Sequence, residues 1–311
     1  MTDKKFLGLL FGQAIGDALG LASEFMTKEE VKHYYPNGIN SYADIIQDRH
    51  RSIWQKGMWT DDTDQMLCIV ESLIQCKEVN LTDIAQRFVA WKKTNGRGIG
   101  RHTLNVLSMG DYVAEPFVAS EFVWQMSRKQ SAANGAIMRT SIVACCDYND
   151  WEKIKENTEN VCKLTHYDPR CVGSCVVITY VVYCCLTNQR INKSDILRIA
   201  DEYDERIGEY IELAFQENIS LLYLDEQGKI GYTLKAMSAA LWAFNHASCF
   251  HSGLKTIIEQ GGDADSNGAV AGAVLGLKFG VDSILPIWID ELIDKAKLLD
   301  IATSFIKTTS S

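Results

Sequence analysis

The chain has 311 residues, of which 47% are apolar, and its formal net charge at pH 7 is −9. This length suits one large domain or two ordinary ones, and the apolar fraction is sufficient for a substantial core. The acidic balance argues against non-specific binding to nucleic acid or to a membrane surface, but it is compatible with a small anionic ligand held by a few local donors.

The ten cysteines favour small buried side chains over a disulfide framework. No long apolar segment follows the charged N-terminus, so we expect no secretory signal and a cytoplasmic protein with reduced thiols. Several cysteines, including Cys145, Cys146 and Cys184, lie inside apolar runs. Cys171 and Cys175 lack a second Cys/His pair at zinc-finger spacing, which argues against a zinc site.

The first expected helix, residues 4–25, carries glycines at a four-residue period, at positions 8, 12, 16 and 20. This period places the glycines along one helix face, where another backbone can approach closely. Asp17 and Glu24 are the acids of this segment, and their ordinary interpretation is a solvated or capping carboxylate. Residues 26–57 that follow are expected to be irregular.

The first acidic stretch, residues 59–64, directly precedes apolar positions at helical spacing from Met66 to Ile74. Thr60 or Asp61 could cap this helix, and acids favour its positive end. One or two acids would meet that need, whereas this stretch places three aspartates among four residues. We therefore favour metal binding over capping alone.

Two glycine-containing loops follow, each leading towards a helix. The first, residues 96–101, comes after a helix expected over Leu81–Trp91 and offers backbone N–H groups beside two arginines. It is not a dinucleotide-binding fingerprint, since no strand precedes it, but it could receive a phosphate. The second loop spans residues 131–140.

An uncharged run, residues 171–188, follows a surface helix over 152–164 and a polar loop that contains His166. Its length is at the short end of a membrane span, and small polar residues dilute it. Because no second candidate accompanies it, we favour a helix buried inside the protein. Residues 190–228 are expected to form helices that cover the core.

The second acidic stretch, residues 261–268, lies between an apolar helix over 233–250 and a buried helix over 269–276. Its beginning fits a calcium-binding EF-hand loop, but the twelfth position is Val274 where that loop needs a bidentate glutamate. Strand-like alternation is sparse along the chain. The sequence therefore predicts an all-α fold, a compact helical bundle, with a single domain over residues 1–311.

The two acidic stretches together supply only oxygen ligands, which Mg²⁺ and Mn²⁺ prefer over zinc or copper. We expect the fold to bring the stretches together around two metal ions with shared ligands and waters. The expected metal ligands are Thr60, Asp61, Asp62, Asp263, Asp265 and Ser266.

Five motifs occur in an order that resembles the ADP-ribosylglycohydrolase family. They are Gly12–Gly20, Trp59–Thr63, Asn134–Arg139, Thr165–His166 and Gly261–Ser266. The resemblance extends from about residue 6 to about residue 280. It implies an all-helical single domain with a binuclear magnesium (or manganese) centre, and hydrolysis of an N- or O-glycosidic bond between ADP-ribose and an acceptor.

Carried over by position, the resemblance also implies roles for individual residues. The catalytic residues would be Glu24, Asp62 and Asp263, and the residues lining the ADP-ribose cleft would be Gly98, Gly100, Asn134, Gly135, Arg139 and His166. Some relatives that act on arginine carry an aspartate near residues 97–99, where this chain has Arg97-Gly98-Ile99, and Ala133 replaces a frequent glycine. The acceptor, a protein side chain or a small molecule, therefore stays open.

Two other functions remain open at this point. One is a non-catalytic member that binds ADP-ribose or metal, although a complete set of acids argues against it. The other is a two-metal phosphohydrolase that acts on a nucleotide. In each case we expect a monomer that binds neither nucleic acid nor membrane.

Overall fold

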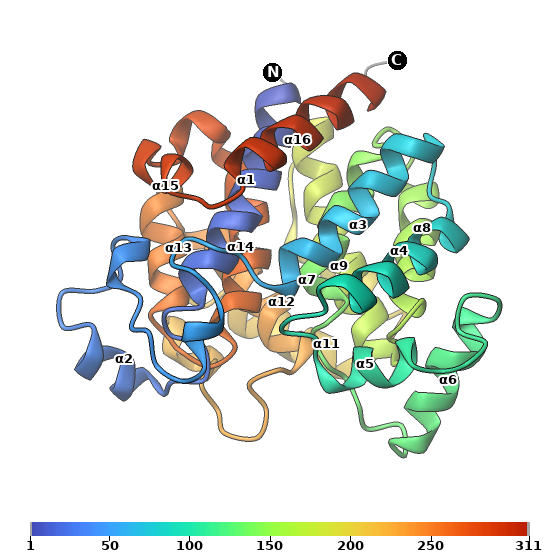
Figure 1. Ribbon diagram of the computed structural model, residues 1–311, viewed down its shortest axis with the longest axis horizontal. Coiled ribbons are helices and arrows are strands. Elements are labelled where there is room, and N and C mark those ends of the chain that lie inside the picture. The colour runs from blue at the N-terminus through green and yellow to red at the C-terminus, as the bar shows by residue number, and fades with distance from the viewer. Residues whose placement is uncertain (1, 310–311) are drawn as a thin grey trace.

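The computed structural model describes residues 2–309 and confirms the all-α prediction (Figure 1). Within that range no β-strand forms, and the extended backbone pairs in an isolated bridge between Ala133 and Tyr232. The α-helices are α1 (Thr2–Gly20), α2 (Lys28–Tyr34), α3 (Asp61–Cys76), α4 (Leu81–Thr94), α5 (Arg101–Leu107), α6 (Pro116–Met126), α7 (Ile137–Thr140), α8 (Trp151–Lys163), α9 (Pro169–Thr187), α10 (Lys193–Ala200), α11 (Glu205–Ala214), α12 (Thr233–His246), α13 (Phe250–Ile258), α14 (Ala264–Phe279), α15 (Pro286–Asp290) and α16 (Lys295–Thr309). Short 3-10 helices η1 (Tyr42–Asp44), η2 (Arg51–Ile53), η3 (Ser141–Cys145), η4 (Ile219–Leu222) and η5 (Val281–Ser283) join some of them.

Helices α1 and α14 pack backbone to backbone at the centre of the molecule. A Cβ atom on Gly12 would lie 2.2 Å from the carbonyl oxygen of Gly272, and one on Gly8 would lie 2.1 Å from that of Gly276. The same close approach joins Gly16 to Gly268. The glycine stripe therefore works as the sequence predicts, and its partner is a second stripe of glycines on α14.

Because α1 and α14 run antiparallel, the C-terminal end of α1 lies beside the N-terminal end of α14. The turn that contains Glu24 thus comes next to the second acidic stretch, and the two backbones bond there: Phe25 N–H donates to the Gly262 carbonyl over 2.6 Å. Two segments far apart in the chain meet at one end of the glycine seam.

Asp17 on α1 fixes the start of α3. Its carboxylate accepts hydrogen bonds from the backbone N–H groups of Thr60 and Thr63, at 2.9 and 3.0 Å, and from the Thr63 hydroxyl at 2.6 Å. Burial raises the pKa of Asp17 to about 7. The acid is therefore a capping carboxylate, as its ordinary interpretation suggests, but it caps a different helix from its own.

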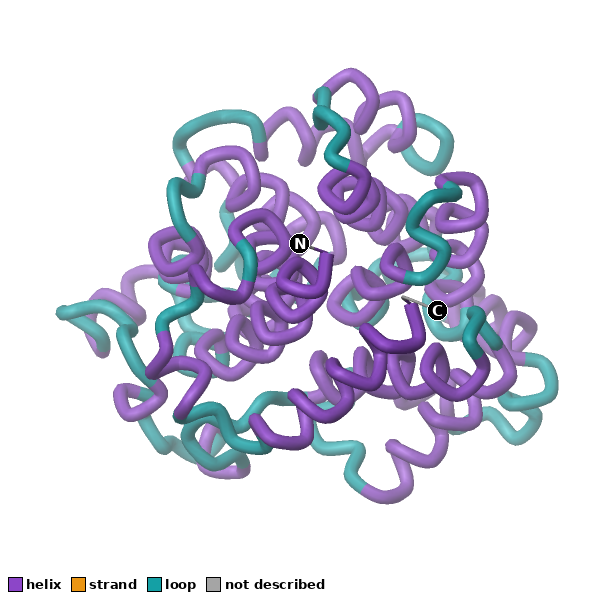
Figure 2. The backbone as a smooth tube through the Cα atoms, turned by 90° about the horizontal axis from the view of Figure 1, so that it is seen from above, coloured by secondary structure: helices purple, strands orange, loops and turns teal. Residues whose placement is uncertain are grey.

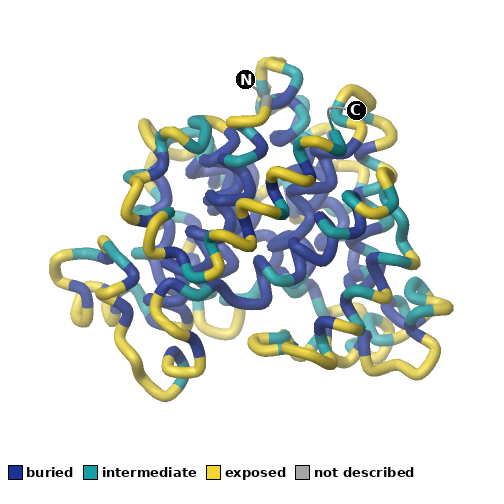
Figure 3. The backbone as a smooth tube through the Cα atoms, turned by 45° about the horizontal axis from the view of Figure 1, so that its top comes forward, coloured by how far each residue is buried: buried dark blue, intermediate teal, exposed yellow. Residues whose placement is uncertain are grey.

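Helix α9 contains nearly all of the uncharged run and begins two residues earlier, with Pro169 and Arg170. It is long and apolar enough to cross a membrane by length and composition, yet 78% of its most apolar window is buried inside the protein. It contacts α8, α12 and η3 within one cluster of apolar side chains. Figure 3 shows this buried centre surrounded by exposed segments, which agrees with the prediction of a buried helix.

The segment 26–57 is less irregular than the sequence indicated. It contains α2, whose capping box joins Thr27 to Glu30: the Thr27 side chain accepts from the Glu30 N–H, and Glu30 accepts from the Thr27 N–H. The Thr-x-x-Glu spacing was present in the sequence as a helix-start signal. Figure 2 shows how helices dominate the backbone, with loops between them.

All ten cysteines lie in the described part of the chain, and none is paired in a disulfide. Seven are buried, and Cys249 is exposed. The observation agrees with their interpretation as small, mostly buried side chains.

We expect Gly272→Ala to lower the free energy of unfolding by about 3 kcal/mol, because the new methyl group would force two helix backbones apart. Intrinsic helix propensity alone would predict the opposite sign, since alanine is the better helix former. Urea unfolding followed by circular dichroism measures the change. Gly110→Ala is the matched control, because a Cβ atom there meets nothing within 4 Å. Equal stability of the two variants would contradict the packing argument.

Candidate functional site

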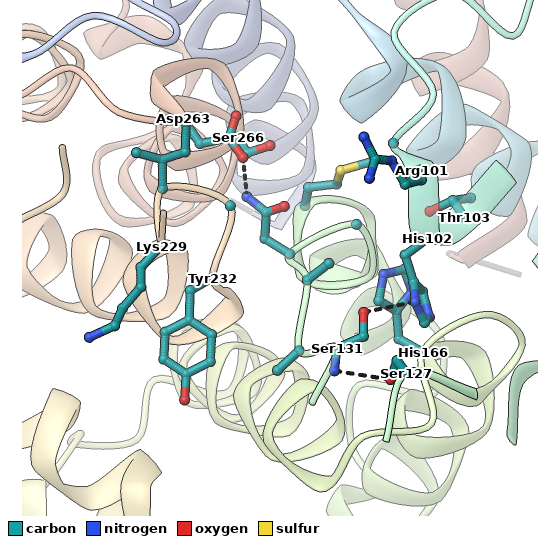
Figure 4. Close-up of a pocket in the computed structure, with 18 of the residues that line it drawn as sticks. Arg101, His102, Thr103, Ser127, Ser131, His166, Lys229, Tyr232, Asp263 and Ser266 are labelled. Carbon is teal, nitrogen blue, oxygen red and sulfur yellow. Dashed lines mark hydrogen bonds between the residues drawn. The ribbon is translucent and has the colours of Figure 1, made fainter. Parts of the chain in front are cut away.

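A cleft of about 1540 Å³ opens where the ends of several helices meet. Its walls come from the turn after α1, the starts of α3, α5 and α14, and the loops before α7 and α12. Figure 4 shows Asp263 and Ser266 on one side of this cleft and His102 and His166 on the other. The volume is large enough for a nucleotide-sized ligand.

Carboxylates concentrate at one end of the cleft. One carboxylate oxygen from each of Glu24, Asp263 and Asp265 lies within 4.8 Å of the others. Asp61 and Asp62, at the first turn of α3, line the same end of the cleft. The fold thus brings the two acidic stretches together, as the sequence predicts, and adds Glu24 to the second stretch.

Burial and mutual repulsion disfavour the charged forms of these acids. Burial raises the pKa of Asp61 and Asp62 well above its ordinary value, and repulsion from neighbouring carboxylates raises each further. The pKa of Asp265 is raised well above its ordinary value for the same two reasons. Burial also raises the pKa of Glu24 and of Asp263. A divalent cation at this position would relieve the repulsion.

Three of these carboxylates are oriented by a neighbouring donor. Asn134 Nδ2 donates to Asp263 Oδ2 at 2.7 Å, and Gln65 Nε2 donates to Asp61 Oδ2 at 2.8 Å. The backbone N–H of Ser266 donates to Asp265 Oδ1 at 2.9 Å. These bonds occupy one oxygen of each aspartate and leave the other for a further partner.

The oxygen set fits hard divalent cations. Asp62 Oδ1 is buried and has no hydrogen-bond partner, which is costly for a carboxylate unless a cation or water binds it. The surrounding ligand atoms are carboxylate and hydroxyl oxygens, which suit Mg²⁺ and Mn²⁺. The residues present therefore fit the expected metal.

Thr60 is the N-cap of α3, and its hydroxyl lies 3.2 Å from Asp62 Oδ2. It is buried and does not line the cleft. Ser266, the other expected hydroxyl ligand, does line the cleft. Asp64 turns away from it and accepts hydrogen bonds from the indoles of Trp59 and Trp91, at 2.9 and 3.0 Å. The acidic run therefore serves both capping and the acidic site.

Gly98 and Gly135 leave room in the cleft walls. Gly98 has φ +86°, and a Cβ atom there would lie 2.5 Å from Asp61 Oδ1, so both the backbone and the neighbouring acid require glycine. A Cβ atom on Gly135 would lie 3.0 Å from the His166 ring. Gly100 and Asn134 line the cleft as well.

Arg139 does not line the cleft, which differs from the expectation. Its side chain is fully buried, stacks over the Phe88 ring at 4.2 Å, and donates hydrogen bonds to Gln65 Oε1 and Thr165 Oγ1. The side chain points inward from α7, where these acceptors and the Phe88 ring surround it. In this structure Arg139 supports residues of the cleft and cannot touch a ligand there.

Two residues that hold Glu24 in place, His50 and Arg51, are not among the site residues expected from the sequence. His50 Nε2 lies 2.6 Å from Glu24 Oε2, and this hydrogen bond raises the pKa of His50. The buried Arg51 donates to the backbone carbonyls of Leu21, Ala22 and Glu24. Together they hold the turn that presents Glu24, and no local pattern in residues 46–57 signals this role.

The whole chain matches one known protein family. The model of the ADP-ribosylglycohydrolase family matches residues 1–311. The chain belongs to the ADP-ribosylglycohydrolase family. Its cleft and acidic cluster are therefore the candidate active site of a family member, and membership supports ADP-ribosyl glycohydrolase activity.

Several relatives share this family across most of their length. The chain is 26% identical to ADP-ribosylarginine hydrolase Tri1 of Serratia proteamaculans, covering 96% of the chain and 78% of the relative. It is 26% identical to ADP-ribosyl-[dinitrogen reductase] glycohydrolase of Rhodospirillum rubrum, covering 92% and 89%. A solved ADP-ribosylglycohydrolase-related protein complex has the same fold, with a TM-score of 0.79 at 23% identity and 99% coverage of both chains.

We expect Mn²⁺ to bind this protein more tightly at about pH 8 than at about pH 5.5, because protons compete for carboxylates whose pKa values are raised. Calorimetric titration measures the affinity, and repeating it in buffers of different ionisation enthalpy measures the protons released. Asp265→Asn should weaken binding at both pH values. An affinity that does not change with pH would contradict the assignment of these acids as ligands.

Proposed function

We propose that this protein is a metal-dependent hydrolase that cleaves the glycosidic bond between ADP-ribose and an acceptor group. The observation that carries the proposal is the convergence of buried carboxylates from both acidic stretches at one end of a nucleotide-sized cleft. Family membership supports the ADP-ribosyl part of the substrate, while the metal dependence rests on the chemistry of the acidic cluster.

The residues that would hold two Mg²⁺ or Mn²⁺ ions are Thr60, Asp61 and Asp62 on one side and Asp263, Asp265 and Ser266 on the other. Thr60 supports Asp62 through its hydroxyl. When bound, a divalent metal pair orients substrate oxygens and makes water more acidic.

We propose Glu24 as the general base. Asp62 and Asp263 are the other two carboxylates that we propose to be catalytic. The carboxylate of Glu24 borders the cleft, its pKa is raised by burial, and His50 holds one of its oxygens. A base with a raised pKa takes a proton from the attacking water more readily near neutral pH. The nearby carboxylates also favour the positive charge that develops on the sugar in the transition state.

The glycine loops in the cleft wall, one of which reaches the acidic cluster at Gly98, would receive the diphosphate and the rest of ADP-ribose. Gly98, Gly100 and Gly135 leave their backbone open to the cleft, and Arg101 adds an exposed cation to its wall. His166 borders the same space with one ring nitrogen that has no partner in the protein. Glycine backbone, one arginine and a histidine form a suitable set of donors for phosphate oxygens.

The proposed acceptor is an ADP-ribosylated side chain, with arginine as the first candidate because two relatives bear names that specify ADP-ribosylarginine. Gly98 has no room for the aspartate found near this position in some arginine-specific relatives, because Asp61 already occupies that space. Phe25 is exposed, follows Glu24 in the chain and lines the cleft, so it is our candidate for contact with the acceptor.

We expect the protein to release ADP-ribose from an ADP-ribosyl-arginine peptide with Mg²⁺ present and to lose this activity with EDTA. Product analysis by chromatography distinguishes the outcomes. Activity on an ADP-ribosyl-serine peptide alone would change the acceptor and keep the reaction. AMP and phosphate would indicate a phosphohydrolase, and ADP-ribose binding without any product would indicate a non-catalytic member.

We expect Asp263→Asn to lower kcat by about three orders of magnitude while the fold is retained, since the variant loses the charge of one central carboxylate. Asp64→Asn is the matched control: it changes an acid of the first stretch that faces two tryptophans and not the cleft, so kcat should stay close to the wild-type value. Circular dichroism confirms that each variant folds. Wild-type turnover by Asp263→Asn would refute its assignment.

A further inference from the structure

Two histidines lie side by side in the wall of the cleft opposite the acidic cluster. The ring centroids of His102 and His166 are 4.6 Å apart, and Figure 4 shows both rings beside Ser131. His166 is fully buried apart from 1% of its surface. In a neutral histidine the nitrogen that carries the proton donates a hydrogen bond and the other nitrogen accepts one, so the proton position decides what each ring can bind.

A single residue, Thr165, contacts both rings. Its backbone carbonyl lies 3.0 Å from His102 Nε2, and its hydroxyl lies 2.7 Å from His166 Nδ1. A carbonyl can only accept a hydrogen bond, so His102 carries a proton on Nε2. The remaining nitrogen of that ring, Nδ1, lies 2.9 Å from Ser131 Oγ, which can donate to it.

The proton position on His166 follows from Arg139. A guanidinium has only donors, so Arg139 Nη2 donates to Thr165 Oγ1, and the single hydroxyl proton of Thr165 stays free to be donated. Its available acceptor is His166 Nδ1. The proton of the neutral His166 ring therefore sits on Nε2.

Other contacts hold Arg139 in place, so the hydrogen bonds that begin at its guanidinium always run from Arg139 outward. Its second terminal nitrogen donates to Gln65 Oε1, which turns the Gln65 amide nitrogen towards Asp61 Oδ2. Phe88 covers one face of the guanidinium at 4.2 Å. The same buried cation thus orients donors towards a carboxylate on one side of the site and towards a histidine on the other.

His166 Nε2 has no hydrogen-bond partner in the protein, although it is buried. It faces Gly135, where an added Cβ atom would lie 3.1 Å away, and it borders the cleft. Burial lowers the pKa of His166 well below its ordinary value, with further lowering from His102 and Arg139, and burial also lowers the pKa of His102. An N–H group without a partner in such a place is a donor ready for a ligand.

We propose that Thr165, held by Arg139, is a positioning residue that fixes both rings in the Nε2–H tautomer, so that His166 presents an uncharged N–H donor to an oxygen of the bound ligand. The inference rests on the proposed function only for the identity of that ligand. It assigns Arg139 a role that needs no contact with substrate.

The tautomers can be measured directly by long-range ¹H–¹⁵N correlation NMR of the imidazole rings. The sequence has six histidines, so His102→Gln and His166→Gln suffice to assign the two signals of interest. In the wild-type protein near pH 7 we expect both rings to be neutral with protonated Nε2. In Thr165→Val we expect His166 to show a mixture of tautomers, because Nδ1 loses its donor.

The same variants test the consequence for binding. Calorimetry with ADP-ribose and Mg²⁺ should show about ten-fold weaker binding to Thr165→Val, as expected when a ligand loses one well-oriented donor. Thr165→Ser restores the hydroxyl and should restore both the tautomer and the affinity. Thr158→Val is the matched control, since it removes another buried hydroxyl, which contacts Thr179 and neither histidine.

The outcomes separate this inference from the proposed function. A wild-type His166 that is charged or protonated on Nδ1 would overturn the inference, as would a Thr165→Val variant with unchanged tautomer and affinity. If ADP-ribose fails to bind the wild-type protein while the tautomers behave as expected, the proposed ligand is wrong and the positioning role of Thr165 stands.

Discussion

The close contact of α1 with α14 is the constraint on which the rest of the structure depends. A carbonyl oxygen can approach the Cα atom of a facing helix this closely only where that Cα atom carries no side chain, and here glycines recur every four residues on both contact faces. The antiparallel direction of the pair then places the turn after α1 beside the N-terminus of α14. Asp17, on the same helix, fixes the start of α3 against this pair. Both acidic stretches and Glu24 owe their positions to this one seam.

The seam also explains how the protein tolerates so many buried acids. Folding forces Glu24, Asp61, Asp62, Asp263 and Asp265 into a small volume where burial raises the pKa of every one of them and repulsion between carboxylates raises most of them further, which costs stability in the absence of a cation. The close backbone contact between α1 and α14 holds the turn with Glu24 beside the second acidic stretch despite this cost. The repulsion between these carboxylates is greatest where a divalent cation would relieve it, so the group of acids that destabilises the fold is also the proposed metal site.

Buried arginines organise the surroundings of the site without touching a ligand. Arg51 binds the carbonyls of the turn that presents Glu24, and Arg139 binds the side chains that orient Asp61 and His166. A guanidinium suits this task because it donates in several fixed directions and never accepts. The residues that we propose to contact a substrate are thereby held in one arrangement of donors and acceptors, as preorganised catalysis requires.

The sequence by itself determined the helical class, the buried character of α9, the glycine stripe on α1 and the acidic stretches at the starts of α3 and α14, because these depend on local spacing and on apolar periodicity. Only the tertiary structure decided that Asp61 and Asp62 face the cleft while Asp64 faces two tryptophans, that Glu24 meets Asp263 and Asp265, and that Arg139 points into the core. Neighbouring residues on a helix differ by about 100° in direction. Which direction becomes the site therefore depends on the partners that other segments of the chain supply.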